Sequence, residues 1–86
     1  MENLETLRSQ IDALDAEISK LLERRLALVS NISKVKKTAG KAIYDPAREQ
    51  EVIDKLPVEN PEYAYPVADT FRDIMRHSRD FQDKQK

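Results

Sequence analysis

The sequence contains no cysteine, only one histidine and no long hydrophobic run. Without cysteine the chain can form no disulfide bond, thiol nucleophile or cysteine-bound metal site. His77 stands without a nearby carboxylate cluster and is a poor metal site by itself. No segment is apolar enough to span a bilayer, and the N-terminus lacks the basic-then-apolar pattern of a signal peptide. We therefore expect a soluble, cytoplasmic protein without a metal site.

An excess of charge of one sign is also lacking. The chain has 15 Lys and Arg against 16 Asp and Glu, so 36% of its residues are charged but its formal net charge is −1. This balance argues against general attraction to nucleic acid or anionic membranes, which both require a net or clustered basic field. With 86 residues the chain is expected to form a single domain, residues 1–86, near the small end for a self-sufficient core.

Helical periodicity dominates the first half of the chain. Asn3 is a suitable N-cap and Gly40, the only glycine, a suitable stop, so we predict one helix over 3–39. At about 1.5 Å per residue it would be roughly 50 Å long, too long to bury its apolar stripe within one chain. A partner subunit is therefore expected. The stripe follows a coiled-coil-like repeat of alternating steps of three and four: Leu4, Leu7, Ile11, Leu14, Ile18, Leu21, Leu28, Ile32 and Val35.

Two shorter helices are predicted in the second half. Asp45 followed by Pro46 is typical of an N-cap and a first helical position, which predicts a helix over 46–56. The proline-rich segment 57–65 is expected to be a loop. Apolar residues at helical spacing then predict a third helix over 66–82. The predicted fold class is all-α, with three helices of which the first is much the longest.

Polar residues interrupt the apolar face of each predicted helix. Buried charges are costly unless they are paired or face a polar ligand. Each residue has a separate structural explanation: a lone arginine in a seam can set register or snorkel, and Lys36 can belong to a solvated basic cluster. One small anionic ligand would explain all of them together, which favours a site. The residues are Arg25 and Lys36 on the first helix, Glu49 on the second, and Ser78 and Gln82 on the third.

With these residues in view, the chain resembles the all-helical chorismate mutase family, which is built as an intertwined dimer of three-helix protomers. The resemblance covers nearly the whole chain. Its markers are two arginines of the first helix, a lysine in SKVKK, the motif D-x-x-R-E as DPARE, and a small polar residue followed four positions later by glutamine as SRDFQ. They correspond to Arg8, Arg25, Lys36, Asp45, Arg48, Glu49, Ser78 and Gln82.

The resemblance implies that the chain converts chorismate to prephenate on the route to phenylalanine and tyrosine. This intramolecular Claisen rearrangement needs no nucleophile, metal or cofactor. The substrate must be held in a compact conformer while negative charge grows on its ether oxygen. Arg8 and Arg25 would each clamp a carboxylate, and Lys36 and Gln82 would donate to the ether oxygen.

The remaining family residues would complete the polar lining. Glu49 would accept a hydrogen bond from the ring hydroxyl group, with help near Asp45. Arg48 and Ser78 would line the pocket, with Ser78 turned toward a carboxylate. Simpler explanations also exist at the sequence level, in which Asp45 is only a cap and Arg48 only a surface charge.

The spacing of two arginines adds a geometric expectation. Arg8 and Arg25 are 17 positions apart, which is about 25 Å along one helix. Both cannot hold one small molecule from a single straight helix. If both serve one pocket, Arg8 must reach the pocket of the other subunit, and the homodimer is a condition of activity.

Three alternatives remain open from the sequence. The chain could be an isochorismate pyruvate lyase on the same scaffold, a non-catalytic dimeric helical interaction module, or a partner of another aromatic-pathway enzyme. The complete D-x-x-R-E and glutamine set favours the mutase over the lyase. The interaction module predicts that Arg25→Leu would be harmless or stabilising and that no small molecule binds.

Overall fold

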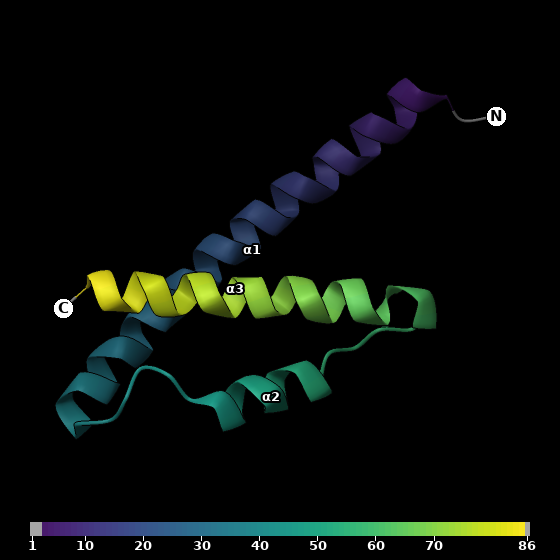
Figure 1. Cartoon of the computed structure of the whole chain (residues 1–86). Helices are drawn as coiled ribbons and strands as arrows, with labels where there is room; N and C mark the ends of the chain where they lie inside the picture. The colour runs from purple at the N-terminus through teal and green to yellow at the C-terminus, as the bar shows by residue number, and fades with distance from the viewer. Residues whose placement is uncertain (1–2, 86) are drawn as a thin grey trace.

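The computed structural model describes residues 3–85, and within this range it contains three α-helices, one short 3-10 helix and no β-strand (Figure 1). The predicted all-α class with three helices is confirmed. No helix in this range is long and apolar enough to cross a membrane, and the cytoplasmic location stays a prediction. The elements are α1 (Leu4–Ala39), α2 (Pro46–Asp54), the 3-10 helix η1 (Pro61–Tyr63) and α3 (Ala64–Lys84).

Local capping interactions set both ends of α1. The Asn3 side chain accepts a hydrogen bond of 2.8 Å from the Thr6 amide, as expected of an N-cap. Gly40 has a φ of 69°, and its N–H bonds to carbonyls of the last turn. A residue with a side chain adopts this left-handed conformation only with strain, so glycine is suited to end the helix. The predicted N-cap and stop are confirmed, although the helix itself begins at Leu4 rather than at residue 3.

Helix α2 begins as predicted and ends earlier. Asp45 accepts a hydrogen bond of 3.0 Å from the Arg48 amide, and Pro46 occupies the first turn. The helix ends at Asp54 rather than at residue 56. Leu56 bonds to the carbonyl three residues earlier, at Ile53, which is a tighter turn than an α-helix makes. The proline that follows disfavours a helical conformation at Leu56, which explains the early end.

Helix α3 is longer than predicted at both ends, covering Ala64–Lys84 instead of 66–82. The segment 57–65 is therefore not all loop, because it contains η1 and the start of α3. Asn60 caps η1 by accepting a hydrogen bond of 3.0 Å from the Glu62 amide. Pro66 falls in the first turn of α3, where a backbone N–H has no helical acceptor, so the proline is tolerated there.

Helix α3 holds the fold together because it packs against both α1 and α2. It crosses the C-terminal half of α1, and α2 lies along it (Figure 1). Among the described residues, the buried apolar side chains are Val29 and Met75, and the buried polar ones are Ser78 and Gln82. The small core therefore lies where the three helices meet, and half of its buried members carry polar groups.

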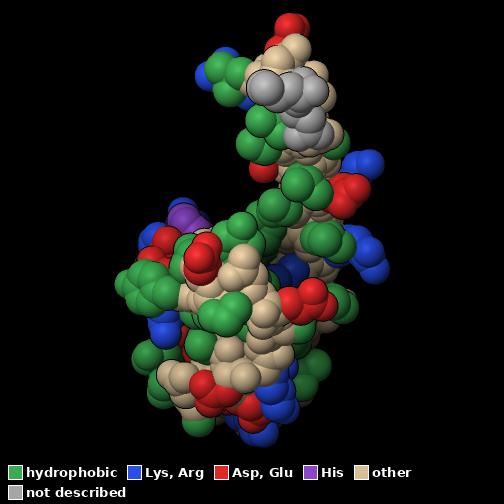
Figure 2. All heavy atoms as spheres, turned by 90° about the vertical axis from the view of Figure 1, so that its right-hand side faces the viewer, with side chains coloured by type: hydrophobic (Ala, Val, Ile, Leu, Met, Phe, Trp, Pro, Cys, Tyr) green, Lys and Arg blue, Asp and Glu red, His purple; other side chains and the backbone are tan. Residues whose placement is uncertain are grey.

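The N-terminal part of α1 projects away from this core (Figures 1 and 2). The molecule measures 57 × 25 × 15 Å as a result. The apolar stripe on the projecting part is between 39% and 62% exposed, and exposed apolar patches of this kind often mark interaction sites. The stripe consists of Leu4, Leu7, Ile11, Leu14, Ile18 and Leu21.

Candidate active site

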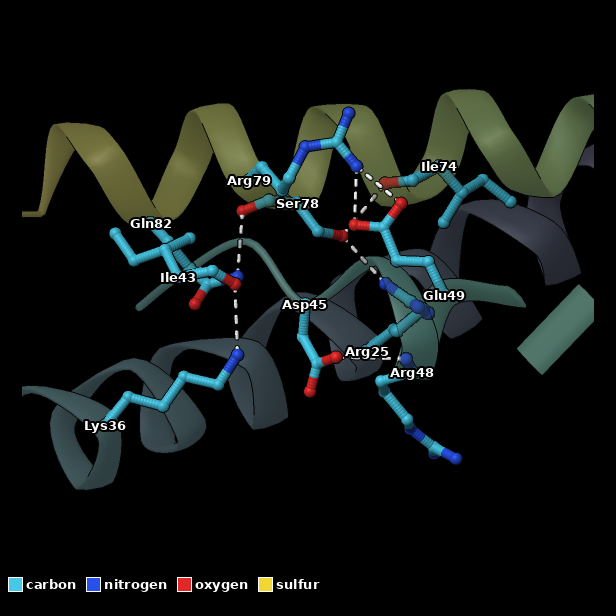
Figure 3. Close-up of polar contacts among 10 residues, drawn as sticks. All are labelled: Arg25, Lys36, Ile43, Asp45, Arg48, Glu49, Ile74, Ser78, Arg79 and Gln82. Carbon is cyan, nitrogen blue, oxygen red and sulfur yellow. Dashed lines mark hydrogen bonds and ion pairs between the residues drawn. The ribbon is translucent and has the colours of Figure 1, made fainter. Parts of the chain in front are cut away.

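A cavity of about 270 Å³ lies between the three helices and the segment 40–45 that connects α1 to α2. Val29, Ile32 and Met75 supply apolar walls. Figure 3 shows Arg25 directed toward Ser78, Glu49 toward Arg79, and Lys36 toward the backbone of Ile43. Seven of the eight residues that the sequence singled out line this cavity: Arg25, Lys36, Asp45, Arg48, Glu49, Ser78 and Gln82.

Arg25 is held in place by a serine on α3. Its Nη1 donates to Ser78 Oγ at 2.7 Å, and Ser78 Oγ in turn donates to the Ile74 carbonyl at 2.9 Å. Burial lowers the pKa of Arg25, the charge of Glu49 opposes that effect, and the charge of Arg48 adds to it. Guanidinium stays charged in proteins and has five N–H donors. Arg25 therefore presents a fixed cation to the cavity, with donors beyond the one that Ser78 accepts.

Lys36 and Gln82 contribute donors from α1 and α3. Lys36 Nζ donates to the carbonyl oxygen of Ile43 at 3.0 Å, and Gln82 Nε2 to the carbonyl oxygen of Ser78 at 3.4 Å. An ammonium group has three N–H donors and an amide nitrogen two, so each has at least one more for a ligand. Gln82 is only 7% exposed, and within residues 3–85 its Oε1 is buried without a hydrogen-bond partner. A buried unpaired oxygen is costly, so this acceptor is available to a hydrogen-bond donor that enters the cavity.

Glu49 is engaged by an arginine that the sequence analysis missed. Nη1 of Arg79 donates to both carboxylate oxygens of Glu49, and its guanidinium carbon lies 4.7 Å from the centre of the Tyr44 ring. The hydrogen bond to Glu49 raises the pKa of Arg79 most strongly, against the opposing effect of burial. A count of helical steps could have found Arg79, because it follows Met75 by four residues on the stripe that includes Gln82. Nothing in the sequence indicated Tyr44 or the backbone carbonyl that binds Lys36.

With this geometry established, comparison with known proteins identifies the family. Residues 7–83 match the family described as chorismate mutase type II. The chain belongs to the chorismate mutase type II family. All eight residues predicted from the sequence lie inside the matched range.

Several curated proteins are similar to this chorismate mutase type II chain. The T-protein of Haemophilus influenzae is 43% identical over 76 residues, which cover 88% of the chain and 20% of that protein. The bifunctional chorismate mutase/prephenate dehydratase of Aquifex aeolicus is 41% identical over 56 residues, 65% of the chain and 16% of that protein. The chorismate mutase of Methanocaldococcus jannaschii is 34% identical over 56 residues, 65% of the chain and 57% of that protein. The chain spans about a fifth of the length of the first of these relatives.

Three predicted residues of this chorismate mutase type II chain have other contacts or lie elsewhere. The Asp45 side chain caps α2, although it also lines the cavity. The Arg48 side chain is 61% exposed, points away from the cavity in Figure 3 and pairs with Glu51 at 2.6 Å. Arg8 lies on the projecting part of α1, is exposed and does not line the cavity.

A second cavity, of about 450 Å³, adjoins the first and shares Lys36, Ile43 and Gln82 with it. Its other charged lining residues are Lys37 and Lys41, and no carboxylate side chain of residues 3–85 lines it. The first cavity is lined by three arginines, Arg25, Arg48 and Arg79, and by the carboxylates of Asp45 and Glu49. Among residues 3–85, no group of three or more His, Asp and Glu side chains is arranged to hold a metal ion.

Proposed function

We propose that this chain catalyses the rearrangement of chorismate to prephenate. The observation that carries the proposal is the single cavity lined by seven of the eight residues that the family resemblance singled out. Its size suits a small ligand, near the lower end of the usual range for such sites. Chorismate carries two carboxylates, a hydroxyl group and an ether oxygen, and the cavity offers cations, a carboxylate and amide donors in return. We also propose that residues 1–86 form one domain of this kind, which the family match over 7–83 supports.

The observed contacts support a role for each group. Arg25, oriented by Ser78 at 2.7 Å, would bind one substrate carboxylate through its remaining N–H donors. Lys36 and Gln82 would donate to the ether oxygen, where negative charge grows as the C–O bond breaks. Glu49 would accept a hydrogen bond from the ring hydroxyl group. The protein would thus hold the substrate in its reactive conformer and stabilise the developing charge.

We propose further that two copies of the chain intertwine and that Arg8 completes the partner's pocket. The exposed apolar stripe on the projecting part of α1 supports this, because a second copy would cover it. Arg25 would pair with one carboxylate of chorismate, and a further cation would pair with the second. Arg8 is exposed on that stripe-bearing part, about 25 Å along α1 from Arg25, and would supply this cation across the interface.

The direct test is to follow the loss of chorismate absorbance with the purified protein and to identify the product. Accumulation of prephenate is expected. A parallel reaction with isochorismate distinguishes the alternatives, since formation of pyruvate from isochorismate without turnover of chorismate would assign a lyase. Inactivity toward both substrates would favour the non-catalytic interaction module.

A further inference from the structure

Arg79 connects three segments at the wall of the cavity. It lies on α3, contacts Glu49 on α2, and stacks on Tyr44 in the segment that joins α1 to α2 (Figure 3 shows the contact with Glu49). The side chains of Arg79 and Glu49 are 28% and 24% exposed, so most of this ion pair is withdrawn from water. Such pairs restrict both partners more than surface ion pairs do.

We propose that Arg79 is a positioning residue that holds the Glu49 carboxylate in place to accept the hydrogen bond from the ring hydroxyl group of chorismate. The inference rests on the function proposed above and deepens it. Arg79 acts through Glu49 and does not itself contact the substrate.

The contact leaves Glu49 able to serve the substrate. A carboxylate has about four lone-pair positions, two on each oxygen. Nη1 of Arg79 occupies one position on each oxygen of Glu49. One position therefore remains on each oxygen for the hydroxyl proton of a ligand.

The contact also keeps Glu49 apart from Arg25. The two charges are close enough that Glu49 opposes the lowering of the Arg25 pKa, yet Arg25 makes its hydrogen bond to Ser78. A carboxylate released from Arg79 would be free to turn toward Arg25 and occupy the donors that a substrate carboxylate needs. The guanidinium of Arg79 also lies over the Tyr44 ring, 4.7 Å from its centre, and this contact further restricts its position.

Steady-state kinetics of Arg79→Gln test the proposal, with Arg76→Gln as the matched control. Arg76 lies one turn earlier on α3, and its ion pairs within residues 3–85 are with exposed carboxylates on the same helix. The rearrangement does not alter the hydroxyl group, so loss of its acceptor weakens substrate and transition state alike. We expect Arg79→Gln to raise KM about tenfold or more and to change kcat less than about threefold. Arg76→Gln should change neither, and Arg79→Lys should restore part of the loss.

A double-mutant cycle then separates positioning from a general structural effect. In a Glu49→Gln background, Arg79→Gln should change kcat/KM by no more than about twofold, because the group through which it acts is gone. On a chorismate analogue that lacks the ring hydroxyl group, Arg79→Gln should raise KM by a smaller factor than it does with chorismate. Full additivity in the cycle, or an Arg79→Gln loss confined to kcat, would overturn the proposal.

An NMR measurement tests the position of Arg79 separately from the activity of the protein. The Nε–H signal of Arg79 in a ¹H–¹⁵N spectrum should show a ring-current shift from Tyr44. That shift should persist in Tyr44→Phe, and should be lost in Tyr44→Leu and reduced in Glu49→Gln. An unshifted wild-type signal would refute the arrangement whatever the activity. A shifted signal in a protein that leaves chorismate unchanged would refute the proposed function, and the substrate role of Arg79 with it.

Discussion

Replacement of Arg25 by leucine should abolish most of the activity and leave the free energy of unfolding unchanged or higher. Arg25 occupies a position in the apolar seam of α1, and burial lowers its pKa, which means that the folded state disfavours its charge. In the proposed function, that charge binds a carboxylate of the substrate. A leucine would restore the seam and remove the clamp.

The structure allows both effects to be estimated. The hydrogen bond from Arg25 to Ser78 is lost, which costs about 1.5–3 kcal/mol for a charged donor. Ser78 still donates to the Ile74 carbonyl, so no buried donor is left unpaired. Full burial of a leucine contributes about 1.5–3 kcal/mol, and this half-buried position gains only part of it, while the cost of burying a charge disappears. The free energy of unfolding should therefore be unchanged or higher, within about 2 kcal/mol.

The loss of activity should be much larger. Two charge-assisted hydrogen bonds to a carboxylate contribute about 3–6 kcal/mol, which corresponds to at least a hundredfold in kcat/KM. Chorismate turnover and thermal unfolding at one fixed protein concentration measure the two quantities. Arg24→Leu is the matched control, because the same change occurs at the neighbouring exposed position and should leave turnover within about twofold.

Two results would refute this reasoning about Arg25. Full turnover by Arg25→Leu would show that the cation does not bind the substrate and would favour a register or snorkelling role. A loss of more than about 3 kcal/mol in unfolding free energy would show that the charge stabilises the fold. In that case the loss of activity would carry no information about the site.

Three further predictions concern the other site residues. Mixing inactive Arg8→Ala and Arg25→Ala chains should restore activity, since a mixed dimer would contain one intact pocket; mixed dimers that form and stay inactive would contradict the shared site. Lys36→Ala should lower kcat by about 10²–10³-fold with a smaller effect on KM, because the contact of Lys36 strengthens as the ether oxygen gains charge. An increase in KM alone would assign Lys36 to ground-state binding. Gln82→Glu should make activity fall as pH rises from acid to neutral, because only a protonated carboxyl can donate to the ether oxygen. A ratio of mutant to wild-type rates that does not change with pH would place Gln82 away from the breaking bond.

The sequence by itself determined the features that depend on near neighbours along the chain. The hydrogen bonds of Asn3 and Asp45 each reach an amide three residues away, and the conformation of Gly40 depends on its own missing side chain. The apolar repeat likewise follows from helical geometry. For the same reason, Arg25 was recognisable as an exception to a regular stripe before its surroundings were known.

Other features were decided only when distant segments packed together. The partner of Arg25 is Ser78, 53 residues away, and the partner of Glu49 is Arg79, 30 residues away. Any of the many charged residues could have paired with Glu49, and the choice depends on how α3 lies against α2. The acceptor of Lys36 is a backbone carbonyl, a group that every residue carries and that no side-chain pattern marks. Local rules thus placed each charge on its helix, whereas the packing of the helices selected its partner.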